Sequence, residues 1–109
     1  HRLLAEVYER YRRPLFIAET SHFGAGRGAW LREVHGEVLT AIQIGVPVEG
    51  ITIYPVIDRP DWDDLEHWHN SGLWDLVSDE QGVLRRVLNE DYAVVFREIQ
   101  QDLAVARQH

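Results

Sequence analysis

The sequence predicts an α/β fold in which helices alternate with parallel strands. Two segments with the composition of β-strands lie near residues 15–19 and 50–55. Segments whose apolar residues recur at helical spacing lie before, between and after them. This order of helix, strand, helix, strand and helix is typical of a parallel sheet with helical crossovers. The composition, 45% hydrophobic and 27% charged over 109 residues, is that of one soluble domain or of part of a larger one.

The first helix is predicted over residues 3–11, where apolar side chains recur at helical spacing. Pro14 marks its end, because a proline excludes the preceding residue from the helical region. The run "LFIAE", residues 15–19, is a short apolar strand of the kind that a parallel sheet buries on both faces. A loop, "TSHFGAGRG", follows, since its three glycines permit backbone shapes that other residues avoid.

The second helix is predicted from about Ala29 to Ile44, where an apolar stripe is followed by Gly45 as a C-terminal stop. The second strand, "ITIYPVI", is rich in β-branched and aromatic residues. Its ladder is expected to end near Tyr54, because Pro55 has no N–H to donate. A last helix is predicted near residues 89–107, where apolar side chains share one face.

A Trp- and Asp-rich segment, "DRPDWDDLEHWHNSGLWDLV", separates the second strand from the last helix. At about 20 residues it is longer than ordinary connections, which favours a functional loop over a simple link.

Composition excludes several classes of function. The net charge of −7 argues against a nucleic-acid partner, since polyanions need a basic face. No apolar run approaches the ~20 residues that cross a bilayer, so no membrane association is expected. The absence of cysteine excludes disulfides and thiolate chemistry and fits a reducing cytoplasm, where we expect the protein to be.

Residues 1–109 are interpreted as a single segment of a larger barrel. Two parallel strands leave both sheet edges open, whereas a closed (β/α)₈ barrel takes eight strands and roughly 250 residues. The chain also begins without Met, which favours a piece of something longer. The alternative is a small complete α/β sandwich with helices on one side of the strand pair.

Two motifs resemble those of clan A glycoside hydrolases. In that clan the seventh barrel strand ends in a nucleophilic Glu within a pattern like I-T-E-N-G, and the eighth carries G-[apolar]-x-x-W-[ST]-[apolar]-[apolar]-D. Here "FIAETS" places Glu19 at the nucleophile's position, and "VEGITIYPVIDRPDW" places Asp58 near the family's Asp. The chain departs from the patterns at Thr20, in place of Asn, and at Tyr54, in place of Trp. The chain therefore resembles the C-terminal segment of such an enzyme, most closely the bacterial β-glucosidase-like proteins of family one.

The resemblance implies the C-terminal (βα) units of a (β/α)₈ TIM barrel and retaining β-glycosidase chemistry. Glu19 would be the nucleophile, and Tyr54, Asp58, Trp62 and His22 would bind a carbohydrate substrate; no cofactor is expected. The general acid, expected on the fourth strand, lies outside these residues, so the isolated segment should be inactive. Its open strand edges should favour self-association or binding to the remainder of the barrel.

The positions of these residues fit that implication. In α/β barrels the active site lies at the carboxyl ends of the strands. Glu19 ends the first strand, while Tyr54 and Asp58 end the second, so all three are expected at one rim. An aromatic ring there suits sugar recognition, because its apolar face covers the C–H face of a pyranose.

Each candidate also has a structural interpretation. Glu19 could cap its loop or pair with an arginine, and Tyr54 could be a core aromatic with a satisfied hydroxyl. Asp58, before Arg59-Pro60, could be a turn former, and Trp62 could pack the loop upon itself. His22 neighbours Ser21, but adjacent residues on an extended chain point apart, which argues against a catalytic triad.

The acidic, His-rich part of the loop raises the alternative of a metal site. It offers Asp63, Asp64, Glu66, His67 and His69, but no catalytic zinc spacing occurs, and we expect no metal. The main rival function is a non-catalytic α/β interaction or carbohydrate-binding module that uses the Trp/His-rich loop 58–74. A metal-dependent enzyme is a weaker third possibility.

Overall fold

The computed structural model describes residues 1–107. In chain order its elements are α1 (Arg2–Tyr11), β1 (Leu15–Thr20), the 3₁₀ turn η1 (Gly24–Gly26), α2 (Arg27–Gln43), β2 (Val48–Ile53), β3 (Trp74–Ser78), β4 (Leu84–Leu88) and α3 (Glu90–Arg107). The predicted order of helices and parallel strands is confirmed, with bounds that differ by a few residues. The second strand covers Val48–Ile53 rather than 50–55.

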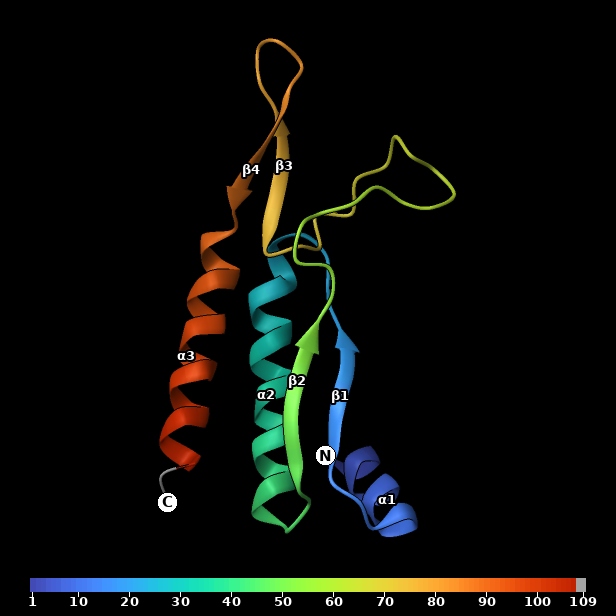
Figure 1. Cartoon of the computed structure of the whole chain (residues 1–109), viewed down its shortest axis with the longest axis vertical. Coiled ribbons are helices and arrows are strands. Elements are labelled where there is room, and N and C mark those ends of the chain that lie inside the picture. Colours follow the sequence, from blue (N-terminus) through green and yellow to red (C-terminus); the bar gives the residue numbers. More distant parts are fainter. Residues whose placement is uncertain (108–109) are drawn as a thin grey trace.

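β1 and β2 form a two-stranded parallel sheet in which Leu15 pairs with Val48, Ile17 with Ile51 and Thr20 with Ile53. Figure 1 shows both arrowheads at the same end, from which the loops after each strand emerge. β2 ends at Ile53, one residue before the predicted end of the ladder near Tyr54. The carboxyl ends of the strands thus lie side by side, as expected for the rim of a barrel.

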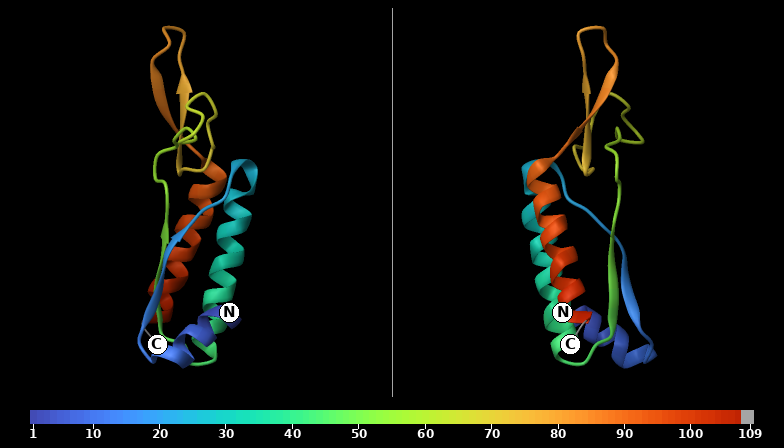
Figure 2. Two further views of the ribbon diagram at one scale, coloured as in Figure 1. Left: turned by 90° about the vertical axis from the view of Figure 1, so that its right-hand side faces the viewer. Right: turned by 60° about the vertical axis from the view of Figure 1, so that its left-hand side comes forward.

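Helices α2 and α3 pack together and cover one face of this strand pair (Figure 2). The core consists of Leu31 on α2 with Tyr92, Val95 and Ile99 on α3. Ile51 and Ile53 of β2 pack against it from the sheet. The opposite face of the sheet carries no element in these views, and Phe16 of β1 is 59% exposed.

The antiparallel hairpin of β3 and β4 was not predicted. The end of the Trp- and Asp-rich segment is a strand from Trp74 to Ser78, so the interpretation of residues 58–77 as one continuous loop was wrong at that end. The turn is closed by Asp79, whose Oδ1 accepts hydrogen bonds from the amides of Gln81 and Val83, both at 2.9 Å. Gly82 adopts a φ of 78°, which an L side chain disfavours.

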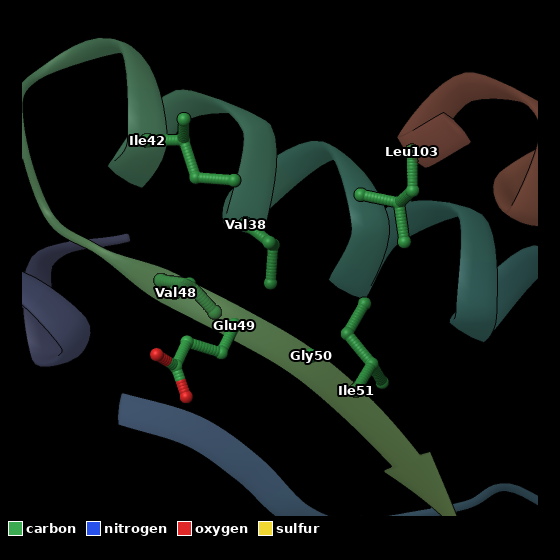
Figure 3. A pocket seen from close by; sticks show the side chains of 7 residues that line it. All are labelled: Val38, Ile42, Val48, Glu49, Gly50, Ile51 and Leu103. Atoms are coloured by element: carbon green, nitrogen blue, oxygen red, sulfur yellow. The ribbon is translucent and has the colours of Figure 1, made fainter. Parts of the chain in front are cut away.

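A hollow of about 560 Å³ lies between α2, β2 and the last turns of α3, at the amino end of the strand pair (Figure 3). Val38, Ile42, Val48 and Leu103 give it an apolar lining. Glu49 directs its carboxylate away from Val38 and Ile42. Among the described residues that line this hollow, only Glu49 has a polar side chain.

Candidate functional site

Glu19 lies on the open face of the strand pair, near the end of β1. Thr20 is directed toward the helices, because its Oγ1 accepts a hydrogen bond from Trp30 Nε1 of α2 at 2.8 Å. Glu19, unlike Thr20, is exposed, as a side chain on the face opposite α2 would be. The β1–β2 register is irregular between Ile17 and Thr20, and both Ala18 and Glu19 are exposed there.

The Glu19 carboxylate makes no side-chain hydrogen bond or ion pair with any part of the chain that the structure describes. The structural alternative, a carboxylate that caps the loop or pairs with an arginine, would need such a contact. The geometry therefore leaves both Glu19 oxygens available to a ligand on the open face.

Tyr54 stands beside this position, because its amide donates a hydrogen bond to Thr20 O at 3.3 Å. Tyr54 is 42% exposed, so it is not a core aromatic. The guanidinium carbon of Arg59 lies 5.9 Å from the Tyr54 ring centroid and 5.0 Å from that of Trp62, which is 78% exposed. Two of the predicted residues, Tyr54 and Trp62, are thus brought together by an arginine that the sequence analysis did not select.

His22 lies in the loop after β1, exposed, with its ring centroid 5.8 Å from that of Trp30. A Cβ at Gly26 would approach His22 Cδ2 to 2.7 Å, so the glycine leaves room for the imidazole. The next residue, Phe23, meets His69 edge to face at 5.2 Å. Loops from the two strand ends therefore meet, as a shared rim requires.

Asp58 is the predicted site residue that lies apart from the exposed set. It is 5% exposed, and its Oδ1 accepts a hydrogen bond from the Ser71 amide at 3.1 Å. Its own amide donates to Trp74 O at 2.8 Å. These contacts close the base of the long loop.

Arg27, at the start of α2, anchors the loops to the hairpin and was also missed by the sequence analysis. It is buried, and its Nε donates to Gly24 O at 2.7 Å while Nη1 donates to Gly72 O at 2.7 Å. Nη1 and Nη2 form a forked ion pair with the Asp75 carboxylate at 2.9 and 3.2 Å. No local sequence signal joins positions so far apart in the chain.

The acidic, His-rich part of the loop is organised by its own contacts. His69 Nε2 lies 3.0 Å from Asp61 Oδ2, and Asp61 Oδ1 accepts from the Asp63 amide at 2.8 Å. The hydrogen bond with His69, followed by that from Asp63, lowers the pKa of Asp61 below its ordinary value. Within residues 1–107, no three His, Asp or Glu side chains are grouped so as to hold a metal ion.

No protein-family model matches the chain, and no curated protein matches it significantly. Solved structures do match. The β-glycosidase from the hyperthermophile Thermosphaera aggregans shares 29% identity over 90% of this chain, with a TM-score of 0.73. A family 1 β-glucosidase from Thermotoga maritima shares 19% sequence identity over 91% of this chain, with a TM-score of 0.72. Fpglu1 from Fervidobacterium pennivoraus shares 22% sequence identity over 93% of this chain, with a TM-score of 0.69.

The chain resembles a segment of the family 1 β-glucosidases. It spans only 20% of the Thermosphaera enzyme, 24% of the Thermotoga enzyme and 22% of Fpglu1. The predicted likeness to this family and the predicted fold class, α/β units of a TIM barrel, are thereby confirmed. No helix of the described residues is long and apolar enough to cross a membrane.

Proposed function

We propose that residues 1–109 form one segment of a retaining β-glycosidase barrel, its C-terminal part, and that Glu19 is the nucleophile. The observation that carries this proposal is the Glu19 carboxylate, which is exposed on the open face at the carboxyl end of β1 and makes no side-chain hydrogen bond within the described residues. The likeness to β-glucosidase structures supports the chemistry, since carboxylates perform both steps in retaining enzymes.

In the proposed reaction, a Glu19 oxygen attacks the anomeric carbon while a second carboxylic acid protonates the departing glycosidic oxygen. The resulting glycosyl ester is hydrolysed by a water, which that second residue, now ionised, deprotonates. The two carboxyl groups must lie ~5–5.5 Å apart. We assign the second carboxyl to a barrel strand outside these 109 residues, so the segment alone should not turn over substrate.

The sugar would lie against the exposed rings of Tyr54 and Trp62, with His22 at the edge. Aromatic faces bury the C–H face of a pyranose and leave its hydroxyls free to hydrogen-bond. Asp58 would support this site from below through its bond to Ser71 rather than touch the sugar.

The outer edges of β1 and β2 have no strand partner within the described residues. Such edges expose backbone N–H and C=O groups that favour pairing with other strands. The segment would therefore associate with the remaining barrel strands or, when produced alone, with a second copy. Sedimentation of the isolated segment tests this, and a monodisperse monomer with a cooperative melt would contradict it.

The exchange Glu19→Gln in the complete protein tests the proposed chemistry. An amide keeps the size of the side chain but cannot attack, so kcat should fall by a factor of about a thousand or more. Affinity for the sugar should change little. Glu49→Gln is the matched control, because Glu49 lies near the amino end of β2, opposite the rim that carries Glu19, and should leave turnover unchanged. Unchanged turnover in Glu19→Gln, with only an altered melting temperature, would refute the assignment.

A non-catalytic carbohydrate-binding or interaction module is the second candidate. Exposure of Trp62 at 78% and Leu65 at 72% in loop 58–74 favours it, because large exposed apolar side chains often mark a binding surface. This function predicts that Trp62→Ala abolishes binding and that no glycoside is cleaved by the complete protein.

A further inference from the structure

Thr20, the residue that follows the proposed nucleophile, is held from two sides. Its Oγ1 accepts a hydrogen bond from Trp30 Nε1 at 2.8 Å, and its carbonyl oxygen accepts one from the Tyr54 amide at 3.3 Å. Trp30 belongs to α2, in the helix layer, whereas Tyr54 directly follows β2. The end of β1 is therefore fixed by both layers at the residue next to Glu19.

The β1–β2 ladder gives Glu19 less support than it gives Thr20. The register of β1 with β2 is irregular between Ile17 and Thr20, and Ala18 and Glu19 are exposed within that interval. Irregular pairing of this kind re-aims a side chain and interrupts the regular ladder bonds that would fix its direction. The orientation of Glu19 therefore depends on where Thr20 is held.

Packing in the core does not explain the position of Trp30. Its side chain is 37% exposed and lies outside the core cluster that the next residue, Leu31, helps to form. The indole ring instead contacts His22, with the ring centroids 5.8 Å apart, and its Nε1–H is directed to Thr20. Trp30 thus connects α2 to the end of β1 and to the loop that follows it.

We propose that Trp30 is a positioning residue for the proposed nucleophile. Its Nε1–H fixes Thr20, and Thr20 holds Glu19 in the orientation from which the carboxylate attacks the anomeric carbon. A displacement of about 1 Å in a reacting group can cost on the order of a hundredfold in rate, so one hydrogen bond beside Glu19 has a measurable effect on turnover. The inference rests on the proposed function, because it takes Glu19 as the nucleophile.

Steady-state hydrolysis of p-nitrophenyl β-D-glucoside by the complete protein tests the inference. Trp30→Phe keeps a ring against His22 but has no N–H, and Thr20→Val keeps the branched shape but has no acceptor. Each exchange should lower kcat about tenfold, the effect of one lost hydrogen bond. KM should change by less than about twofold, because neither side chain touches the sugar. Thr20→Ser restores the acceptor oxygen and should retain most of the wild-type kcat.

The double variant Trp30→Phe/Thr20→Val separates action through this hydrogen bond from two independent effects. It should lose about tenfold in kcat, as each single variant does, because both exchanges remove the same bond. Thr40→Val is the matched control, since Thr40 Oγ1 donates to Gly36 O at 3.0 Å toward the other end of α2 (Figure 1) and should leave kcat unchanged. Circular dichroism checks folding, and each single variant breaks the bond independently of the other.

Full turnover in Trp30→Phe and Thr20→Val, with Glu19→Gln inactive, would overturn the inference and leave the proposed function standing. Losses that multiply in the double variant, a raised KM in Trp30→Phe, or no rescue by Thr20→Ser would also overturn it. A lowered melting temperature with kcat intact would show a purely structural role for Trp30 and overturn it as well. Turnover that persists in Glu19→Gln, or no cleavage by the wild type, would refute the proposed function and the inference with it.

Discussion

The amide of Tyr54 donates a hydrogen bond to the carbonyl oxygen of Thr20 over 3.3 Å, which joins the two strand ends beyond their regular ladder. Glu19 directly precedes Thr20 in the sequence. The Arg59 guanidinium lies over the Tyr54 ring and also over the Trp62 ring. This backbone contact between parallel strands therefore holds Tyr54 beside the residue that follows the proposed nucleophile.

The Arg27–Asp75 pair should be a main source of stability at this end of the molecule. Arg27→Gln would remove the charge opposite Asp75, which is half-buried, and leave the carbonyls of Gly24 and Gly72 without their donor. We expect a loss of about 3 kcal/mol in the free energy of unfolding, measured by urea denaturation.

Arg27→Lys is the control for that experiment, because it keeps a charge but cannot reach three acceptors with a planar fork. It should lose part of the stability that Arg27→Gln loses. If the urea concentration at the midpoint of unfolding is the same in the wild type and in both variants, the Arg27–Asp75 pair does not stabilise the folded state.

Gly72 should be intolerant of any side chain. A Cβ at this position would lie 2.5 Å from the Asp58 amide nitrogen and 2.9 Å from the Ile57 carbonyl carbon, and these backbone atoms cannot give way cheaply. Gly72→Ala should therefore destabilise the protein by about 2 kcal/mol or more, measured by the melting temperature and by urea denaturation.

Gly36→Ala is the matched substitution in α2, where a Cβ would meet nothing within 4 Å. It should stabilise the protein by about 0.5–1 kcal/mol, because alanine has the better helix propensity. Equal effects of the two exchanges would contradict the packing argument at Gly72.

Asp61 should make stability depend on pH in the acidic range. Its folded-state pKa is lowered by the hydrogen bond with His69, so its contribution is present above the unfolded value near 3.8 and is lost as pH falls through the lower folded pKa. Asp61→Asn should therefore flatten the decline of the unfolding free energy below about pH 4. Urea denaturation between pH 3 and 6 measures the slope.

Asp79 provides the comparison, because the Val83 amide, Arg85 and the Gln81 amide also lower its pKa. Asp79→Asn should also reduce the fall of the unfolding free energy at acid pH. In this variant the lost contacts are those of the β3–β4 turn and not those of the long loop. If the unfolding free energy falls equally with decreasing pH in the wild type and in both variants, neither carboxylate stabilises the folded state.

Elements with a strong local pattern were predictable from the sequence. The last helix was expected at 89–107 and covers Glu90–Arg107, because its apolar spacing and its buried face coincide. The strand that ends in Glu19 was predicted as well, since a short apolar run bounded by Pro14 and a glycine-rich loop has few other interpretations. The β3–β4 hairpin was missed, because its apolar side chains are largely exposed and its first strand continues a Trp- and Asp-rich loop.

The sequence by itself determined the alternation of helices and parallel strands, and with it the side-by-side position of the strand ends that carry Glu19 and Tyr54. Only the tertiary structure decided that Asp58 is buried against Ser71, that Arg27 pairs with Asp75 and that Arg59 lies between two rings. The physical reason is the sequence distance over which each feature is determined. Helix and strand periodicity depends on residues close together in the sequence, whereas the partner of a buried charge depends on how distant segments pack.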